Sequence, residues 1–206
     1  GSPDLVYTFT TTMEQDVTIS AQAVTGESLS YAVRSACEMA DSQVRCDYGN
    51  PAAGVLHQLP AGTYFVIVEG PTFRDVDFTL DVAFGPPTPP AAGDTCGNPI
   101  VLVDGTPAMG TFLDKQNDVD VSCGFRYRDA VYEFTLTEAR DVLLELDAGS
   151  FANASIRPTC DDGATQIRCT SGNPVRQRIR NLAAGTYYVI AESSRGGGFD
   201  LSLTTT

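Results

Sequence analysis

Residues 59–70 read LPAGTYFVIVEG, and residues 182–193 read LAAGTYYVIAES. Both stretches place a turn-forming Ala-Gly pair directly before a run that is apolar on both faces. A short run of this kind, rich in β-branched and aromatic residues, is typical of a strand in the centre of a sheet. We therefore expect a central strand over residues 64–68 and a second one at the matching place in the other stretch.

The match between the two copies extends well beyond this strand. Residues 4–10 read DLVYTFT and residues 129–135 read DAVYEFT, and each copy continues through a C-x8-C pair to a closing F-x-L strand. The copies are 125 residues apart at the first of these strands, 123 at the cysteines and 121 at the last strand. A period this long, with small drifts, is typical of tandem domains whose loops differ in length and not of a solenoid.

Most of the remaining chain is typical of short strands separated by turns that contain Gly and Pro, and no stretch shows a capped helical period. We therefore expect an all-β chain of two tandem antiparallel β-sandwich domains, jelly-roll-like in type, over residues 1–85 and 94–206. Residues 86–93 hold most of a proline-rich stretch, which predicts an extended linker between the domains.

The two domains differ at their front. The second has residues 94–128 before its D-x-V-Y strand, and Asp104-Gly105 predicts a hairpin there between strands at 100–102 and 109–112. The first has three residues before its strand, and Gly1-Ser2 is typical of a cloning remnant, so we expect a piece of a longer protein. Either the front strands of the first domain were removed or it lacks them. If they were removed, a sheet edge that another strand can fill is exposed.

The six cysteines predict disulfide bonds. Each copy carries one C-x8-C pair, and the other two cysteines would close a longer loop at the front of the second copy. There is no C-x-x-C, and a single histidine does not complete the usual zinc spacings, so disulfides are favoured over metal ligands or thiols. An even, fully assignable set indicates an oxidising compartment, hence a secreted or cell-surface protein. The predicted bridges are Cys37–Cys46, Cys96–Cys123 and Cys160–Cys169.

The chain is strongly acidic, with a formal net charge of −13. Such a surface repels phosphate backbones, which argues against nucleic acid as a partner, and it disfavours anionic membranes. No apolar run approaches the length of a membrane span, so membrane insertion is not expected. The charge suits solubility outside the cell and the binding of cations.

Catalytic patterns are weak. His57 is the only histidine and aligns with an arginine in the other copy, so we interpret it as a surface residue. Asp4 and Asp16 recur as Asp129 and Asp141, each at a strand boundary, where an aspartate usually accepts hydrogen bonds from backbone N–H groups. We therefore expect a non-catalytic chain, with a hydrolase that uses paired carboxylates as the least favoured alternative.

One loop is a candidate calcium site. Residues 114–120 read DKQNDVD and place four oxygen-bearing side chains beside Cys123. Hard cations bind several carboxylate and carbonyl oxygens from a flexible loop, although this loop lacks the glycine and the terminal glutamate of an EF-hand. The alternative is a solvated acidic loop. The candidate calcium ligands are Asp114, Asn117, Asp118 and Asp120.

Arginines gather at one place in this acidic chain. Arg176, Arg178 and Arg180 alternate, so they line one face of one expected strand, and Arg168 lies close in sequence. Arginine recognises carboxylates through paired hydrogen bonds, so the row is a candidate surface for an acidic partner. The alternative is that these residues pair with acids on adjacent strands of their own domain.

The D-x-V-Y-x-F-T strand, the C-x8-C loop, the L-x-A-G-T-Y-[FY]-V-I strand and the closing F-x-L-x-L strand together resemble the bacterial pre-peptidase C-terminal (PPC) domain. The resemblance covers residues 4–84 and 94–206. Asp94-Thr95-Cys96-Gly97-Asn98 and Ser122-Cys123-Gly124 resemble the disulfide-bonded front segment of that domain in secreted modular proteins.

The resemblance implies jelly-roll accessory modules that sit behind exported enzymes, often in tandem, and serve binding, spacing or secretion without catalysis. Related collagen-binding modules use calcium to stiffen their N-terminal segment. We expect a monomer whose partner is an extracellular protein or polysaccharide. The alternative function is a structural or adhesive repeat of a large surface protein, stiffened by calcium at its joints.

Overall fold

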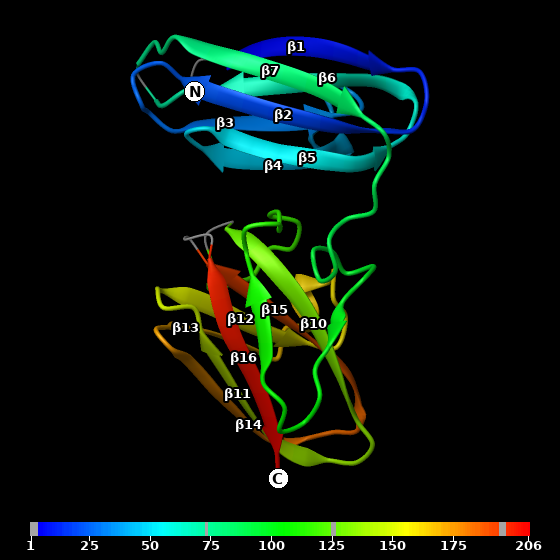
Figure 1. Ribbon diagram of the computed structural model, residues 1–206, viewed down its shortest axis with the longest axis vertical. Coiled ribbons are helices and arrows are strands. Elements are labelled where there is room, and N and C mark those ends of the chain that lie inside the picture. Colours follow the sequence, from blue (N-terminus) through cyan, green and yellow to red (C-terminus); the bar gives the residue numbers. More distant parts are fainter. Residues whose placement is uncertain (1–3, 73, 125–126, 194–196) are drawn as a thin grey trace. The chain divides into compact units, whose positions relative to one another are not determined.

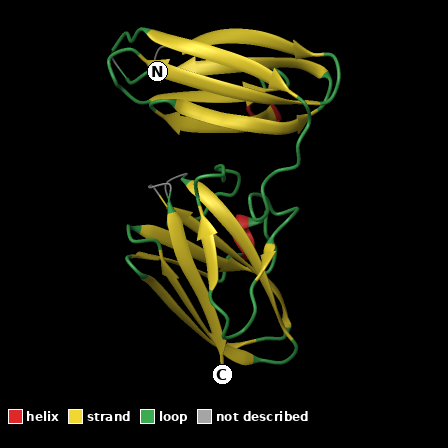
Figure 2. Cartoon of the chain, viewed as in Figure 1, coloured by secondary structure: helices red, strands yellow, loops and turns green. Residues whose placement is uncertain are grey.

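The computed structural model describes residues 4–72, 74–124, 127–193 and 197–206, so Gly1-Ser2 lies outside the described part of the chain. The chain divides into two compact units, Gly1–Pro89 and Pro90–Thr206 (Figure 1). Strands make up almost all of the regular structure of each unit, and two short 3-10 turns are the only helical elements among the described residues (Figure 2). No described helix is long and apolar enough to span a bilayer.

Unit 1 is a sandwich of two antiparallel sheets. The first sheet holds, in spatial order, β1 (Asp4–Thr11), β6 (Gly62–Glu69), β3 (Leu29–Arg34) and β4 (Gln43–Gly49). The second sheet holds β5 (Ala52–Leu59), β2 (Gln15–Ala23) and β7 (Phe78–Gly85), and the 3-10 turn η1 (Ala40–Ser42) precedes β4.

Unit 2 repeats this plan and adds one strand to each sheet. Its first sheet holds β13 (Arg168–Gly172), β12 (Ala152–Arg157), β15 (Gly185–Ser193), β10 (Arg128–Leu136) and β8 (Ile100–Val101). Its second sheet holds β14 (Val175–Leu182), β11 (Arg140–Asp147), β16 (Gly198–Thr205) and β9 (Ala108–Thr111), and η2 (Gly163–Thr165) precedes β13. Seven strands therefore correspond between the units in the same order, from β1 and β10 to β7 and β16.

The core of each unit lies between its two sheets and follows from strand alternation. Val17, Ile19 and Ala21 of β2 are fully buried, with exposed or half-buried polar residues between them. In β11 the inward residues are Val142, Leu144 and Leu146, which are also fully buried. Because a strand of period two presents one apolar face, these alternations place two apolar faces opposite each other. The predicted all-β class of tandem antiparallel sandwiches is confirmed.

The extra strands of unit 2 come from residues 94–127, which we call the front segment. Its two strands do not pair with each other. β8 runs parallel to β10, with Ile100 opposite Tyr132, whereas β9 runs antiparallel to β16 in the other sheet. The predicted hairpin is therefore wrong, although Gly105 does form a turn with a φ of +72°. The front segment crosses from one sheet to the other and caps an edge of each.

The disulfides of unit 2 correct the predicted pairing. The bonds are Cys96–Cys160 and Cys123–Cys169, with Cα–Cα separations of 5.7 Å in both. The predicted bridges Cys96–Cys123 and Cys160–Cys169 are wrong, because each cysteine of the C-x8-C loop lies against the front segment and bonds to it. Spacing along the chain favoured closure of the short loop, but packing across the sheet decided the partners.

The small cluster around these bonds shows why. Val119 and Val121 of the front segment pack on Val131 and Ile190, on the outer face of the five-stranded sheet. Val131 and Ile190 are adjacent partners in the β10–β15 ladder and are fully buried. The outer face of this sheet is thus covered by the front segment, which is stapled to it at both cysteines.

The predicted Cys37–Cys46 bridge of unit 1 is also wrong, since Cys37 is a half-buried thiol. Cys37 follows β3, and Cys46 lies on β4 opposite Ala32. This is the place that Cys169 occupies opposite Ser155 in unit 2. In unit 2 each cysteine of the C-x8-C pair therefore bonds outside the pair, and in unit 1 the pair is not bridged.

The expected linker, residues 86–93, contains the boundary between the two units. Thr88 belongs to unit 1, where its backbone N–H donates to Asp16. Gly93 belongs to unit 2, where its N–H donates to the carbonyl of Asn98 and its carbonyl accepts from the N–H of Val131. Each end of the segment is thus fixed to its own unit.

Candidate functional site

Two buried carboxylates lie beneath the front segment of unit 2. Asp94 starts the segment and is 1 % exposed, and Asp129 on β10 is fully buried. The Oδ1 atom of Asp94 accepts a hydrogen bond of 2.7 Å from the backbone N–H of Gln116. The Oδ2 atom of Asp129 accepts from the N–H groups of Asp118 and Val119, at 2.8 and 3.0 Å. Both carboxylates therefore hold the same loop.

Part of this polar cluster lacks a hydrogen-bond donor. The Oδ1 atom of Asp129 and the Oδ1 atom of Asn117 are buried, and neither accepts a hydrogen bond from the described part of the chain. Burial raises the pKa of Asp129 well above its usual range, the backbone N–H groups of Val119 and Asp118 oppose this, and the charges of Asp118 and Glu192 add to it. A buried carboxylate oxygen without a donor is the kind of atom that a bound cation satisfies.

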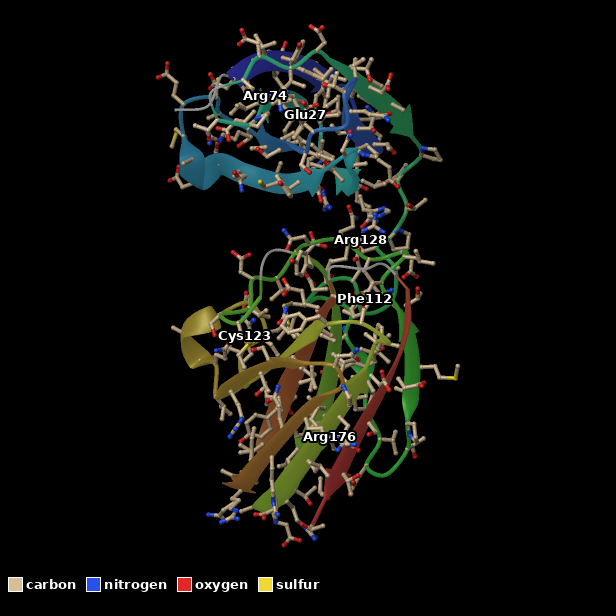
Figure 3. All side chains as sticks on the ribbon, turned by 90° about the vertical axis from the view of Figure 1, so that its left-hand side faces the viewer. Glu27, Arg74, Phe112, Cys123, Arg128 and Arg176 are labelled. Carbon is tan, nitrogen blue, oxygen red and sulfur yellow. A yellow bond between two sulfur atoms is a disulfide. The ribbon has the colours of Figure 1, made fainter. Side chains whose placement is uncertain are left out.

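A third buried acid fixes the far end of the front segment. Glu192 of β15 is fully buried, accepts from the N–H of Tyr127 at 3.0 Å and accepts from the side-chain amide of Asn153 at 2.9 Å. Gly124 passes so close that a Cβ atom there would lie 1.8 Å from the Oε2 atom of Glu192. A larger residue at this position would clash with Glu192. The position directly follows the bonded Cys123, which Figure 3 labels.

The structure divides the four predicted calcium ligands. The carboxylate of Asp114 lies 2.8 Å from the Nζ atom of Lys115, with its side chain about half exposed. Asp118 and Asp120 are exposed, and the carbonyl of Asp120 accepts from Arg157 at 2.8 Å. Within the described ranges no three acids, histidines or cysteines gather closely enough to hold a metal ion. Of the four, only Asn117 has a buried side-chain oxygen that accepts no hydrogen bond from the described residues.

The sequence prediction named the loop of residues 114–120 but did not assign Asp94 or Asp129 to it. Asp129 recurs in the first copy as Asp4, which suggested a role common to both copies. Asp4, however, is exposed. The two equivalent aspartates differ in burial, and this difference cannot be read from the sequence.

His57 does not belong to a catalytic relay. Its Nδ1 atom lies 3.1 Å from Asp16 Oδ2 and 3.1 Å from Thr88 Oγ1, so both neighbours contact the same ring nitrogen. A serine-protease-type relay needs the acid on one ring nitrogen and the nucleophile on the other. This arrangement anchors a loop and does not activate a hydroxyl.

Asp16 and Asp141 hold equivalent irregularities in the two units. Asp16 accepts from the N–H of Gln58 at 2.8 Å, and Asp141 accepts from the N–H of Asn181 at 2.9 Å. Gln58 and Asn181 have left-handed φ values of 51° and 50°, and each lies where the register of its ladder shifts. The carboxylate compensates for the interrupted strand pairing at each bulge.

Asp16 makes the stability of unit 1 depend on pH. Burial opposes its ionisation, but hydrogen bonds from the Thr88 hydroxyl, from the N–H groups of Gln58 and Thr88 and from His57 lower the pKa to about 2. An unfolded aspartate titrates near pH 3.9, so this stabilisation is present above about pH 4 and is lost as the pH falls towards 2.

We expect Thr88→Val to lower the unfolding free energy of unit 1 by roughly 1 kcal/mol at pH 7, because the hydroxyl that stabilises the Asp16 carboxylate is removed. The difference from the unsubstituted chain should shrink as the pH approaches 2. Denaturant titrations of both proteins at several pH values measure this, and a deficit that stays constant with pH would contradict it.

The predicted arginine row lies on the edge strand β14. Arg176 Nε lies 2.5 Å from Glu145 Oε1, and a guanidinium nitrogen of Arg178 lies 2.9 Å from Asp141 Oδ2. A guanidinium nitrogen of Arg168 donates to the carbonyl of Arg178 at 3.4 Å. The side chains of Arg176 and Arg178 remain 70 % and 58 % exposed, and Figure 3 shows Arg176 away from Cys123 within unit 2.

In this geometry the arginine row can still bind an external carboxylate. Each ion pair joins β14 to β11 within the same sheet, as the alternative interpretation expected, yet most of each guanidinium still faces solvent. Exposed pairs of this kind contribute at most about 1 kcal/mol to stability, so exchanging one for an external carboxylate involves little loss.

Comparison with protein families matches residues 94–197, half of the chain, to a family described as "Galactose binding domain-like", whose name associates it with T9SS, the type IX secretion system. The matched region starts at Asp94, so it includes the front segment, and it continues through β15. No curated protein matches the chain.

Proposed function

We infer a function from the premise that the chain belongs to the T9SS-associated galactose-binding-domain-like family. The chain serves as a non-catalytic accessory module of a secreted or cell-surface protein. The two disulfides of unit 2 support this location, because such bonds persist in oxidising compartments. The family association with a secretion system supports the same location.

The observation that carries this proposal is that the recurrent and buried acids described above hold the backbone of the fold. Asp16 and Asp141 each hold a strand bulge, and Asp129 and Glu192 hold the front segment. A general acid or base must instead reach a substrate atom from a cleft. Each of these carboxylates accepts at least one hydrogen bond from a backbone N–H group.

We extend the proposal to unit 1, as a second module of the same kind. It shares seven strands, their order and the Asp16-type bulge with unit 2. The sequence resemblance to PPC domains supports the same role for both, which is to bind, space or aid the export of a partner domain. The alternative is a structural or adhesive repeat. Cation binding at the joints between units would favour this alternative.

We also propose that unit 2 binds calcium beneath its front segment. Asn117 and Asp129 each supply a buried oxygen that accepts no hydrogen bond from the described residues, and Asp94 brings a second carboxylate to the same loop. Oxygen donors of mixed carboxylate and amide type suit Ca²⁺. The bound ion would neutralise the buried charge and fix the loop that the disulfides staple.

For the partner, we propose an acidic extracellular polymer that contacts the arginine row of Arg176, Arg178 and Arg180, together with Arg168 on β13. The row is exposed in an otherwise acidic chain, and guanidinium groups bind carboxylates in pairs. Both a carboxylated polysaccharide and an acidic protein have this chemistry.

The test is retention of the full chain on immobilised polygalacturonate, polyglutamate and neutral galactan, with soluble products measured in parallel. We expect salt-sensitive retention on one acidic polymer, no hydrolysis, and a weakening of roughly tenfold in Arg176→Gln/Arg178→Gln/Arg180→Gln. Arg140→Gln, on β11 outside the row, is the control and should bind nearly as before. Release of products would contradict the accessory role, and equal binding by the triple variant would contradict the row.

A further inference from the structure

The first strand of unit 1 is exposed where its counterpart in unit 2 is buried. The same ladder register defines the correspondence, since Asp4 pairs with Glu69 in unit 1 and Asp129 with Glu192 in unit 2. Leu5, Val6 and Tyr7 are 54 %, 49 % and 41 % exposed, whereas the matching Ala130, Val131 and Tyr132 are at most 1 % exposed. Three consecutive apolar residues on an edge strand are an unusual surface for a secreted domain.

The front segment accounts for this difference in unit 2. Val119 and Val121 cover Val131 and Ile190. In unit 1 the corresponding pair is Val6 and Ile67, which are also partners in the ladder. The two residues that the sheet contributes to this cluster in unit 2 therefore have counterparts in unit 1, of the same residue types and in the same register.

The cysteines complete the correspondence. Cys37 and Cys46 hold the positions of Cys160 and Cys169, which bond to the front segment in unit 2. Arg157, which donates to the carbonyl of Asp120 in the front segment, likewise has a counterpart in Arg34 at the end of β3. Unit 1 thus keeps the residues on the sheet that bind a front segment in unit 2.

A groove at one end of the unit 1 sandwich indicates the size of the side chain that a docked segment would insert there. It is lined by Leu5, Leu29, Val68 and Phe78, with Arg74 at its rim in an ion pair with Glu27 (Figure 3). In unit 2 the place is filled by Phe112, which is fully buried and packs on Phe199 with the rings tilted by 30° and their centroids 4.3 Å apart.

The lining residues of unit 1 are larger than their counterparts. Leu5, Leu29 and Val68 stand where unit 2 has Ala130, Ala152 and Ala191, all buried around the cluster that contains Phe112. The groove therefore takes a smaller apolar side chain than phenylalanine. A segment adapted to unit 1 is expected, and not an identical copy of residues 94–127.

We propose that unit 1 docks a front segment of its own, carried by the polypeptide immediately ahead of Asp4, and that Cys37 and Cys46 form disulfides with two cysteines of that segment. The source is set by connectivity, because the front segment of unit 2 runs directly into β10 at Arg128. This inference concerns how unit 1 is completed and goes beyond the proposed accessory function.

Each bridge forms by oxidation of two thiols. One S–S bond is made, and two protons and two electrons leave the pair. The electrons pass to an existing disulfide, either that of an oxidoreductase of the exporting compartment or that of oxidised glutathione, which is reduced to two thiols. The same oxidant makes the two bridges of unit 2.

The test uses the chain extended at its N-terminus by the residues that precede Asp4 in the natural polypeptide. Both proteins are denatured without reductant, labelled with a maleimide and mapped by mass spectrometry. We expect Cys37 to be labelled in the present chain and protected in the extended one, where Cys37 and Cys46 each appear cross-linked to a cysteine of the extension. Hydrogen exchange of residues 4–8 should slow by roughly tenfold or more.

Three results would overturn the proposal: an extension without two cysteines, a Cys37 that stays reactive in the extended chain, or a bridge between Cys37 and Cys46 there. A disulfide-linked dimer of the present chain through Cys37 would instead assign the surface to a second copy. As a folding control, the extended chain with Cys37→Ser and Cys46→Ser should keep the bonds of unit 2 and lose the added protection of residues 4–8.

Discussion

We expect removal of the Cys96–Cys160 bond to lower the melting temperature of unit 2 by about 15 °C. The bond closes a loop of 64 residues, for which the chain-entropy model gives roughly 4 kcal/mol of stabilisation. A unit of this size shifts by about 4 °C per kcal/mol. The change is Cys96→Ser/Cys160→Ser, which removes both thiols and leaves no sulfur to form a wrong bond. Calorimetry of the full chain measures the transition.

The matched control is Cys37→Ser, at the position of Cys160 in the other unit. Cys37 is a thiol in this chain, so its loss should change the melting temperature by a few degrees at most. An unchanged transition in the double variant would contradict the assignment. So would a loss in Cys37→Ser as large as that in the double variant.

Calcium at one hundred times its dissociation constant is expected to raise the melting temperature of unit 2 by about 10 °C, which corresponds to about 2.7 kcal/mol of linked stabilisation. Asp129→Asn should abolish this rise, because the amide keeps the acceptor for Asp118 and Val119 but supplies no charge to the ion. In a chelator the same variant should melt above the unsubstituted chain, since it no longer buries a carboxylate.

Asp4→Asn is the matched control for this experiment. Asp4 occupies the equivalent strand position in unit 1 and is exposed, so its neutralisation should leave both the calcium response and the chelated melting temperature unchanged. Identical melting curves in calcium and in chelator would contradict a calcium site. A calcium response that survives Asp129→Asn would place the ion elsewhere.

The strands could be predicted because their residues carry local information. The runs after Gly62 and Gly185 are apolar on both faces, and the structure places both strands inside a sheet. The pairing of the front segment was less accessible. Asp104-Gly105 does turn the chain, but the strands on either side extend two different sheets instead of pairing with each other.

The disulfide partners and the buried acids depend on contacts between distant residues, which no local pattern records. The short C-x8-C spacing favoured local bridges, whereas the cover of Val119 and Val121 over the sheet brought other sulfurs together. Asp129 looked equivalent to Asp4 by sequence, and only the front segment makes it buried. Both differences therefore have a single physical cause.

That cause, a front segment stapled across the outer face of one sheet, is tested most directly by peptide mapping of the unreduced chain. The account predicts cross-linked peptides that join Cys96 to Cys160 and Cys123 to Cys169. Peptides that join Cys96 to Cys123 and Cys160 to Cys169 would contradict it.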